Sequence, residues 1–593
     1  MKGLMMVFLA TVAALFLAGS CLNAAAEKEA NFNRYEFTLP SISGAADSGF
    51  AVYETDSFEL IDSQVPPPDE KRRGGFAAFA CPGQYQQVSF AVYALKDLTG
   101  LKTIVTDLRG KGGSIPARQF QVNYIRRCPE RLYYGDPPQN TAIVDRFLER
   151  KDSLNLPAQN FKEIWVTVKV PENAAAGIYS GNIRITADNS PAKSFPLQLE
   201  VLPFKLDPVP NKKYGVYYRG LADRKRLGVE LQDIAEHGAT VLQAALEGGR
   251  TQSKIKYLSG DGGKIEINTQ RVEKWLQSLR DCHFPSGPTF VYLDFERLAN
   301  ILGHKDVPLG WRNPRGQDGT SLDTDPVFQE YADKVIQRLS EIQKNYPEYE
   351  IILTDLDEIE WGLVPLWVRL VRAAKQTPRF RTYQTFSLCS SPTGTEKELA
   401  EIAPYTDIVS GGSVSHWLSK GLSIREISDK VRSYGMEFWI YPNPTGAAMV
   451  PKRYRLTNGL YLWLMPISAS VPYTYQAPQG DFFNDADGYD FGFSFFSDED
   501  GRMVATKSWE AYRQGIYDLQ YIHTLENLIE RKKAKAPVEA RKAAEFLDRL
   551  RARLSASPEG VDPLKVWLKN LSNRELDRIR REIVDRIMSL QKS

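Results

Sequence analysis

The sequence has few cysteines and none spaced as a zinc site. Only five occur among 593 residues: Cys21, Cys81, Cys128, Cys282 and Cys389. No CxxC motif is present, and although His283 adjoins Cys282, no second thiol lies near them in sequence, so a structural zinc is not expected. In an exported protein Cys81 and Cys128 can form a disulfide, but two separate buried thiols are an equally good interpretation.

The sequence also lacks an excess of either charge. It has 75 Lys and Arg against 73 Asp and Glu, a formal net charge of +2, and no basic block stands apart from interleaved acids. This balance gives no support for nucleic acid or an anionic membrane as a partner.

Cofactor motifs are missing as well. No predicted strand is followed by a glycine-rich phosphate turn, and Gly411-Gly412 alone is a weak signal. Two Asp-rich segments, Asp485 to Gly488 and Asp498 to Gly501, lack the ligand spacing of a calcium loop, and we interpret them as turns. We therefore expect no metal and no cofactor.

The amino terminus has the pattern of an export signal. Lys2 precedes an apolar run from Leu4 to Leu17 that is too short for a confident membrane span, and small residues lead to Cys21. Lipid modification of Cys21 is the favoured outcome, although Ala18 stands where lipoproteins usually have Leu. Ala24-Ala25-Ala26 offers an ordinary signal-peptidase site instead. We expect an exported bacterial protein, either an outer-membrane-anchored lipoprotein or a periplasmic or secreted one, with residues 1–26 as the signal.

A chain of this length is too long for one core, and two or three domains are expected. Residues 27–205 contain short period-two segments separated by Gly, Pro and Asp, which predicts an antiparallel β-sandwich. The clearest of these segments are Val88–Tyr93, Ile164–Val170, Gly181–Ile185 and Phe195–Val201. Pro203 to Asn211 then carries three prolines without periodicity and predicts a domain junction.

Residues 211–515 alternate between strand-like and helix-like segments. About eight such units predict a (β/α)8 barrel, with an open doubly wound sheet as the main rival. The expected strands are Tyr214–Tyr218, Thr240–Ala245, Thr289–Leu293, Ile351–Leu353, Thr382–Ser387, Ile408–Ser410, Glu437–Tyr441 and Ala469–Tyr475. Residues 516–593 are predicted to be helical and to pack on the barrel or form an appendage. A coiled coil is the minority interpretation, because Pro558 and Pro563 interrupt the heptads.

The fourth of these strands ends in a crowd of carboxylates. Asp355, Asp357, Glu358 and Glu360 follow Ile351-Ile352-Leu353 within a few positions. Burying so many like charges is costly, so they are expected at the mouth of the barrel, where such enzymes carry out catalysis. Asp357 and Glu358 are the predicted catalytic pair. The structural alternative is that the doublet only caps a helix amino terminus.

Polar and aromatic residues follow the other predicted strands. They are Tyr218, Arg219, Glu247, Asp294, Glu296, Tyr383, Gln384, His416, Trp417, Tyr441, Asn443, Trp463, Tyr473 and Tyr475. Aromatic rings pack on the C–H faces of sugars and carboxylates bind hydroxyl groups, so this combination indicates carbohydrate chemistry. As substrate contacts we select Tyr383, Trp417, Tyr441, Trp463 and Tyr473, each with simple packing as the alternative.

Two adjacent carboxylates fit one glycosidase mechanism better than the others. Inversion needs acids roughly 6.5–9.5 Å apart, which neighbouring residues do not readily give. In substrate-assisted retention the 2-acetamido oxygen of the substrate attacks the anomeric carbon, while Asp orients the amide and Glu protonates the leaving group.

Three stretches resemble glycoside hydrolase family 123. They are Gln159-Asn160-Phe161 through Trp165–Val168 to Gly177–Gly181, the pair Asp357-Glu358, and Asn484–Gly488 to Trp509–Tyr521. The resemblance covers most of the chain. It implies a β-sandwich, a (β/α)8 catalytic domain, and release of terminal β-linked N-acetylgalactosamine by a retaining, substrate-assisted mechanism. Asp357 would then orient the acetamido group and Glu358 would be the general acid/base. Ile359-Glu360-Trp361 departs from the family, in which Pro usually follows the pair.

Two other functions remain open from the sequence. One is a non-catalytic glycan-binding surface lipoprotein, and the other is a barrel glycosidase with a different sugar specificity. The sequence does not determine the oligomeric state.

Overall fold

The computed structural model describes residues 49–58, 74–131, 141–219, 224–244, 253–259, 264–307, 318–357, 359, 363–375, 380–386, 395–411, 423–442, 450–477, 480–485, 491–497, 501–558 and 561–593. The chain forms two compact units: Met1–Lys205 with Thr445–Val450 and Gly480–Tyr489, and Leu206–Pro444 with Pro451–Gln479 and Asp490–Ser593. The predicted export signal and Cys21 lie outside the described residues. No helix within the described ranges is long and apolar enough to cross a membrane.

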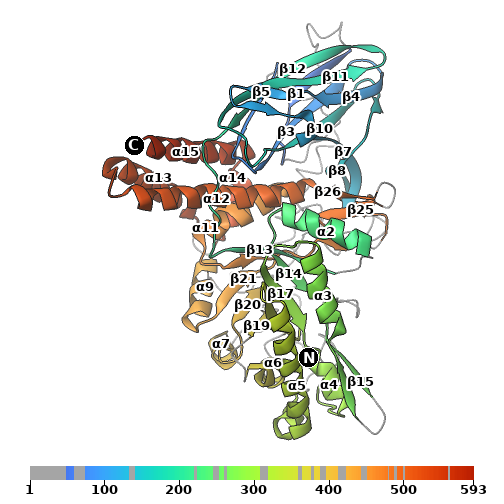
Figure 1. Ribbon diagram of the computed structural model, residues 1–593, viewed down its shortest axis with the longest axis vertical. Helices are drawn as coiled ribbons and strands as arrows, with labels where there is room; N and C mark the ends of the chain where they lie inside the picture. The colour runs from blue at the N-terminus through green and yellow to red at the C-terminus, as the bar shows by residue number, and fades with distance from the viewer. Residues whose placement is uncertain are drawn as a thin grey trace, which may run out of the picture. The chain divides into compact units, whose positions relative to one another are not determined.

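The first unit consists of two β-sheets (Figure 1). One sheet has the order β1-β3-β10-β7-β8, and the other has the order β2-β12-β11-β4-β9, with β5 and β6 beside β11. The strands are β1 Phe50–Glu54, β2 Phe76–Ala80, β3 Tyr85–Ala94, β4 Leu98–Val105, β5 Leu108–Gly110, β6 Gly113–Ile115, β7 Phe120–Arg131, β8 Thr141–Glu149, β9 Leu154–Leu156, β10 Phe161–Lys169, β11 Gly177–Ala187 and β12 Ser190–Val201. A 3-10 turn, η4 (Ala117–Gln119), precedes β7.

The two sheets share one hydrophobic core. Phe90 and Ile164 of the first sheet belong to the same buried cluster as Ile183 and Leu197 of the second. The period-two segments read from the sequence supply these residues, because alternate side chains of a strand point to the same face. All described strand pairs of this unit are antiparallel except β2–β12, where Leu197 lies opposite Phe76 in a parallel register. These two strands are far apart in sequence, so no hairpin fixes their relative direction.

Cys81 and Cys128 are buried free thiols. The disulfide interpretation was therefore wrong, and the interpretation as separate thiols is confirmed. Burial raises the pKa of Cys128 to about 12, so this thiol stays protonated and inert at neutral pH.

The second unit contains a closed barrel of eight parallel strands, in the order β13-β14-β17-β18-β19-β20-β21-β22. Every strand predicted from the sequence is present. The bounds are β13 Lys213–Tyr218, β14 Val241–Ala244, β17 Gly287–Tyr292, β18 Tyr349–Thr354, β19 Arg381–Phe386, β20 Ile408–Gly411, β21 Glu437–Ile440 and β22 Ala469–Ser470. The open-sheet alternative is excluded, because β22 pairs with β13.

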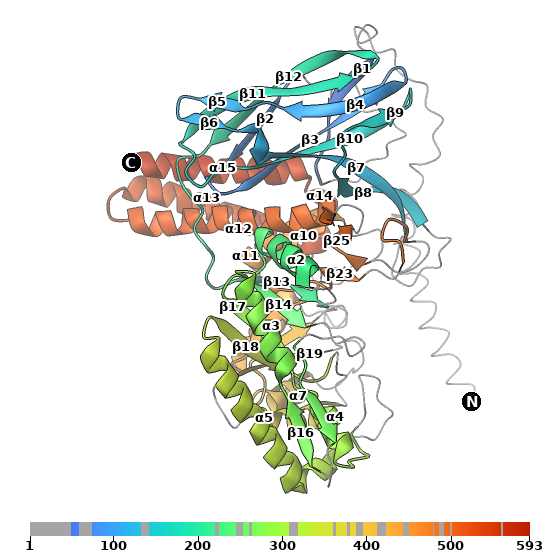
Figure 2. The same cartoon turned by 45° about the vertical axis from the view of Figure 1, so that its right-hand side comes forward.

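Helices connect the barrel strands, as Figures 1 and 2 show. They are α2 Arg224–Glu236, α3 Gln270–Asp281, α4 Phe295–Ile301, α5 Pro326–Asn345, α6 Val364–Lys375, α7 Thr395–Ile402, α9 Ile424–Ser433, α10 Pro451–Leu456 and α11 Leu462–Leu464, with η7 Thr320–Thr324 before α5 and a π-helical turn, η10 Thr457–Tyr461, between α10 and α11. The sequence did not predict α4, α10 or the hairpin of β15 (Lys256–Ser259) and β16 (Ile265–Asn268).

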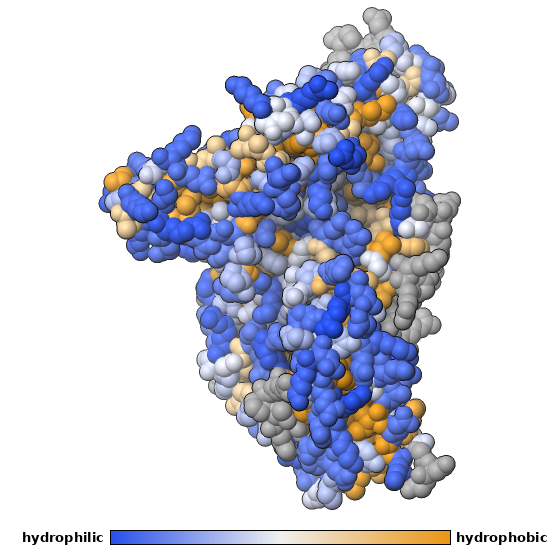
Figure 3. Space-filling view, viewed as in Figure 1, coloured by the Kyte–Doolittle hydropathy of each residue, from blue (hydrophilic) through white to orange (hydrophobic). Residues whose placement is uncertain are grey.

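Short strand pairs and four helices follow the barrel. The strands are β23 Gln476–Ala477, β24 Phe491–Gly492, β25 Ser494–Ser497 and β26 Arg502–Ala505, and the helices are α12 Lys507–Lys532, α13 Pro537–Ser555, α14 Pro563–Asn570 and α15 Asn573–Lys592. The predicted apolar positions of this tail, including Phe546, Leu550, Ile579 and Ile583, are buried. Helix α12 is continuous through residue 515 and packs against both α10 and α15. The face of the molecule in Figure 3 is mostly hydrophilic.

Two glycines let α12 approach the barrel closely. A Cβ on Gly515 would lie 2.5 Å from the carbonyl oxygen of Arg455, and a Cβ on Gly459 would lie 3.1 Å from the carbonyl oxygen of Gly515. Because real Cβ atoms do not approach that closely, a side chain at Gly515 would push α12 away from α10.

A buried ion network fixes this contact. The Asp518 carboxylate of α12 accepts from Arg455 Nε of α10 at 2.8 Å and from Arg580 Nε of α15 at 2.6 Å. Burial by itself would raise the pKa of Asp518, but the two guanidinium groups outweigh it and hold that pKa below its usual range. Asp577 also accepts from Arg455, at 2.7 Å, but its side chain is 60% exposed.

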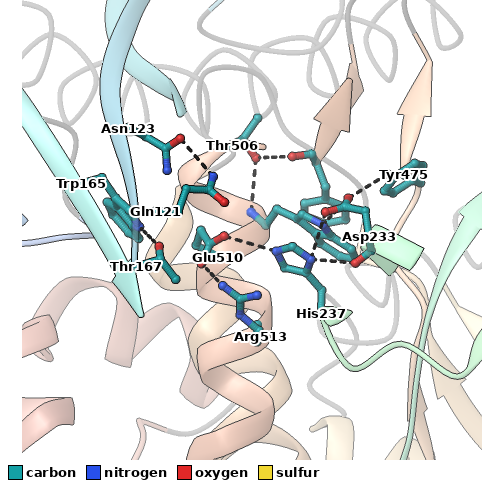
Figure 4. A network of polar contacts seen from close by, with 12 residues as sticks. Gln121, Asn123, Trp165, Thr167, Asp233, His237, Tyr475, Thr506, Glu510 and Arg513 are labelled. Carbon is teal, nitrogen blue, oxygen red and sulfur yellow. Dashed lines mark hydrogen bonds and ion pairs between the residues drawn. The ribbon is translucent and has the colours of Figure 1, made fainter. Parts of the chain in front are cut away.

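A second network joins α12 to α2 (Figure 4). His237 Nε2 lies 3.3 Å from Glu510 Oε1, and Arg513 donates to the other oxygen of this carboxylate. Asp233 accepts from Trp509 Nε1 at 3.0 Å and from the Tyr475 hydroxyl at 2.8 Å. Burial opposes ionisation of Glu510, yet Arg513 and His237 lower its pKa to about 2. Helix α12 thus contacts both α10 and α2.

Asp518→Asn tests the first network. The substitution leaves two buried guanidinium groups without their carboxylate, so we expect a loss of about 3–5 kcal/mol in the free energy of unfolding, measured by urea denaturation. Asp577→Asn is the matched control. It also removes an acceptor from Arg455, but at an exposed site, and should cost less than about 1 kcal/mol. Equal effects of the two substitutions would contradict this description of the network.

Candidate active site

The carboxyl ends of the barrel strands bring Asp357 next to several tyrosines. Asp357 lies three residues beyond the end of β18 and is half-buried. The Thr385 hydroxyl of β19 donates to Asp357 Oδ1 at 2.8 Å, and the backbone N–H of Ile359 donates to the carbonyl of Thr385 at 3.1 Å. The residues on both sides of position 358 are therefore attached to the end of β19. Glu358 itself lies outside the described residues.

Four tyrosines line the interior of the barrel and its mouth. Tyr217 lies at the centre: its hydroxyl is 3.5 Å from that of Tyr383, and its ring centroid is 6.0 Å from that of Tyr441 and 5.6 Å from that of Tyr473. Tyr217, Tyr383 and Tyr441 belong to one buried cluster, against which Tyr473 packs. The structure thus brings three of the five predicted substrate contacts together with the predicted Asp.

These hydroxyl groups are held in their protonated form. Burial raises the pKa of Tyr217 and of Tyr383 well above the ordinary value, and the Asp357 carboxylate raises both further. At neutral pH both tyrosines can donate hydrogen bonds, as the recognition of a carbonyl or hydroxyl oxygen requires.

Arg219 adds a positive charge at this end of the barrel. It follows β13, and its guanidinium donates to the Tyr473 hydroxyl at 2.6 Å. Its carbon Cζ also lies 5.9 Å from the centroid of the Tyr473 ring. Arg219 was among the residues read from the strand ends.

Trp463 does not join this group. It lies on α11, before β22, and its indole N–H donates to Glu526 of α12 at 2.8 Å, with Arg551 of α13 over its ring. The prediction of Trp463 as a substrate contact at the barrel mouth does not fit this position, because the segment before a strand lies at its amino end. Trp417, the fifth predicted contact, lies outside the described residues, as do Glu247, His416 and Asn443.

Tyr218, listed from the sequence as a polar residue at the end of β13, is not the tyrosine of this strand that joins the cluster. Tyr218 points away from the barrel interior: its hydroxyl donates to Glu230 of α2 at 2.5 Å and its ring stacks on Trp275. Tyr217 is the inward residue. The strand is buried on both faces, so its sequence carries no alternation that would have told the two apart. Thr385 was also missed, because nothing in its neighbourhood in sequence marks a partner for Asp357.

A second group of acids lies at the start of α4. Asp355 is fully buried, and its Oδ1 accepts from the backbone N–H of Phe295 at the start of α4, at 2.9 Å. Asp294 is 3.0 Å from Lys254, and Glu296 accepts from the Tyr292 hydroxyl at 3.3 Å. Burial, and then the charge of Glu296, raise the pKa of Asp355 well above its usual value. Asp355 is thus hydrogen-bonded to the start of α4, away from the tyrosine cluster.

No group of three or more His, Cys, Asp or Glu side chains within the described ranges is arranged to hold a metal ion.

Residues 76–187 match the sequence model of the glycoside hydrolase 123 N-terminal domain. No curated protein matches the chain in sequence. Among solved structures, the chain is similar to a family 123 glycoside hydrolase from Clostridium perfringens, with 14% identity over 92% of this chain and 98% of that one and a TM-score of 0.64. Matches to an endo-1,4-β-mannanase from Rhizomucor miehei (13% identity, 46% of this chain and 88% of that one) and a family 39 glycoside hydrolase from Bacteroides cellulosilyticus (13%, 71% and 81%) have TM-scores of 0.33 and support no inference.

Asp355→Asn tests the assignment of this residue as a buried neutral acid. A folded-state pKa above the unfolded value of about 3.9 means that the folded protein retains a proton, so stability falls as the pH rises through that interval. Asn cannot ionise but keeps the acceptor for Phe295. The variant should therefore gain stability relative to wild type between pH 4 and pH 8 in urea titrations.

Asp355→Ala is the control, because it removes the acceptor and should be destabilised at every pH. If the Asn variant instead loses stability relative to wild type as the pH rises, Asp355 is ionised in the folded protein.

Proposed function

We propose that this chain, which resembles glycoside hydrolase family 123 in the sequence of its first unit and in its fold, is a glycoside hydrolase. More specifically, we propose that it releases terminal β-linked N-acetylgalactosamine by a retaining, substrate-assisted mechanism. The observation that carries the proposal is the position of Asp357, which Thr385 fixes at the carboxyl end of a closed barrel beside buried tyrosines.

Each acid of the pair has a role in the proposed mechanism. Thr385 positions Asp357, whose carboxylate would accept from the N–H of a substrate acetamido group and orient the acetamido oxygen toward the anomeric carbon. Bond formation from that oxygen gives a cyclic intermediate as the glycosidic bond breaks. Glu358 protonates the leaving oxygen and then removes a proton from the water that opens the ring, with retention of configuration.

The tyrosines supply recognition. Their raised pKa values keep the hydroxyl groups of Tyr217 and Tyr383 protonated, which suits them to donate to the acetamido carbonyl or to sugar hydroxyls. Tyr441 follows β21 and Tyr473 follows β22, and we propose that they offer aromatic surface for the C–H face of a sugar. The substrate would therefore be a glycan or glycoconjugate.

The location follows from the amino-terminal sequence. Lys2, the apolar run to Leu17 and the small residues before Cys21 support export, with lipid anchoring at Cys21 as the favoured outcome. An exported enzyme of this type would act on glycans outside the cytoplasm.

Hydrolysis of aryl β-N-acetylgalactosaminides tests the proposed chemistry. Glu358→Gln should lower kcat at least about 10²-fold for a substrate with a poor leaving group, and much less for an activated aryl substrate, because only the former needs protonation. Asp357→Asn should lower kcat for both. Asp355→Asn is the matched control, since it alters an acid of the same segment that has a structural partner, and it should leave kcat unchanged.

Other outcomes identify the two alternatives. Glycan binding without turnover, unaffected by substitution of the pair, would indicate a binding protein. Equal cleavage of substrates with and without the 2-acetamido group would indicate a glycosidase of different specificity. Equal rates for wild type and Glu358→Gln on every substrate would refute the assignment of the pair.

Thr385→Val tests the positioning of Asp357. Loss of a hydrogen bond to a charged group costs about 1.5–3 kcal/mol, so kcat should fall roughly 10- to 100-fold. Thr385→Ser retains the hydroxyl and should restore most of the activity, which a purely packing role of the Thr methyl group would not. Similar losses in both variants would mean that Thr385 does not act through its hydroxyl.

A further inference from the structure

A polar pocket lies at the amino end of the barrel. Its volume is about 540 Å3. Residues 209–212, which lead into β13, and residues 464–468, which lead into β22, form part of its wall, together with α9, α12 and α13. Asp357 follows the carboxyl end of β18, so this pocket is at the opposite end of the barrel from the proposed active site. Helices α9 and α11, labelled in Figure 1, contribute Arg425, Arg432 and Trp463 to its lining.

Cations dominate the charged lining of this pocket. Lys212, Arg425, Arg432 and Arg551 line it, together with His523, against one carboxylate, Glu526. That carboxylate already has partners: it accepts from Trp463 Nε1 at 2.8 Å and from Arg551 at 3.4 Å, and His523 lies 3.7 Å away. Glu526 therefore offsets only part of this positive charge. Two of the arginines also have an acid outside the lining: Asp429 lies 3.9 Å from Arg432, and Asp548 lies 3.2 Å from Arg551.

Two of the cations are held in place by backbone carbonyls. Lys212 Nζ donates to the carbonyls of Ile467 at 2.6 Å and of Met465 at 3.3 Å, and Arg425 donates to the carbonyl of Leu464. Neutral carbonyls orient these groups without cancelling their charge. Burial, and then the neighbouring Arg432, lower the pKa of Lys212 to about 8, while Glu526 opposes the shift. A bound anion would relieve the repulsion between Lys212 and Arg432.

The rest of the lining suits a molecule larger than a simple ion. The volume falls within the range of small-molecule sites, roughly 300–1,000 Å3, and far exceeds that of an inorganic oxyanion. Apolar side chains, among them Val209, Leu464, Pro466 and Leu519, accompany the cations, and Trp463 adds an aromatic ring. Glu526 and Ser468 can bind hydroxyl groups.

We propose that this pocket is a second binding site, distinct from the proposed active site, for a sugar that carries an anionic substituent such as a carboxylate or sulfate. Lys212, Arg425 and Arg432 would bind the oxyanion, while Glu526 and Trp463 would face the hydroxyl groups and the C–H surface of the ring. The inference does not depend on catalysis at Asp357.

Isothermal titration calorimetry of the full chain at low ionic strength tests the proposal. The probes are glucuronic acid, glucose 6-sulfate, glucose and inorganic sulfate. We expect at least one of the two charged sugars to bind, and glucose and inorganic sulfate to bind at least about tenfold more weakly. Binding should persist in Asp357→Asn, which separates this site from the proposed active site. Absence of binding by both charged sugars, or equal affinity for inorganic sulfate, would overturn the proposal.

Arg432→Gln should weaken binding of the charged sugar by about tenfold or more, because a hydrogen bond to a charged group is lost. The Arg432 side chain is 57% exposed, so the fold should tolerate the change. Lys212→Met, which keeps the shape of the side chain, should have a similar effect, with its thermal midpoint measured alongside. Arg338→Gln, at a 49% exposed position on α5 outside the pocket, is the matched control. Equal affinities of Arg432→Gln and Arg338→Gln would refute the role of the pocket.

Discussion

Closure of eight parallel strands is the constraint on which the rest of the second unit depends. Pairing of β22 with β13 brings together side chains that are more than two hundred residues apart in sequence. The rings of Tyr217, in β13, and Tyr473, just after β22, for example, have centroids 5.6 Å apart. It also separates two ends with different chemistry. The carboxyl end carries Asp357 and the tyrosine cluster, whereas the amino end carries the cationic pocket around Lys212.

Buried charge holds the outer layer on this barrel. Helix α12 contributes Asp518 to a network with α10 and α15, and Glu510 to a network with α2. In both networks the carboxylate remains ionised because cationic partners outweigh the cost of burial. For Asp355, also buried, burial and the charge of Glu296 outweigh the Phe295 hydrogen bond and Lys254, and its pKa is raised. Buried carboxyl groups of this unit thus differ in their protonation according to the charged groups beside them.

The sequence predicted the strands and most helices well, but it predicted less well in which direction each side chain points. Runs such as Ile351-Ile352-Leu353 between polar segments identified all eight barrel strands, because a strand buried on both faces leaves a continuous apolar run. The same property hid the direction of each side chain, so Tyr218 was preferred to Tyr217. Helix α10 and the turn η10 were missed, since Pro451, Thr457, Asn458 and Gly459 are weak helix formers. Their conformation depends on α12, which approaches through Gly515.

For the candidate site, the sequence supplied the acids and three of the aromatic residues, but not the contacts that give them roles. In the structure the Thr385 hydroxyl donates to Asp357 and positions it, whereas the backbone N–H of Phe295 donates to Asp355. Trp463 was placed with the strand ends although it precedes β22, because a short helix between two strands could not be recognised from its residues. Glu358 remains a prediction from the sequence.

Inhibition by a thiazoline that mimics the cyclic acetamido intermediate tests the central claim most directly. A transition-state or intermediate mimic binds at least about 10²-fold more tightly than substrate when the enzyme stabilises that species. Competitive inhibition of aryl β-N-acetylgalactosaminide hydrolysis by the thiazoline, with an inhibition constant at least about 10²-fold below KM and weakened in Asp357→Asn, is the predicted result. Hydrolysis that the thiazoline does not inhibit would contradict substrate assistance at Asp357.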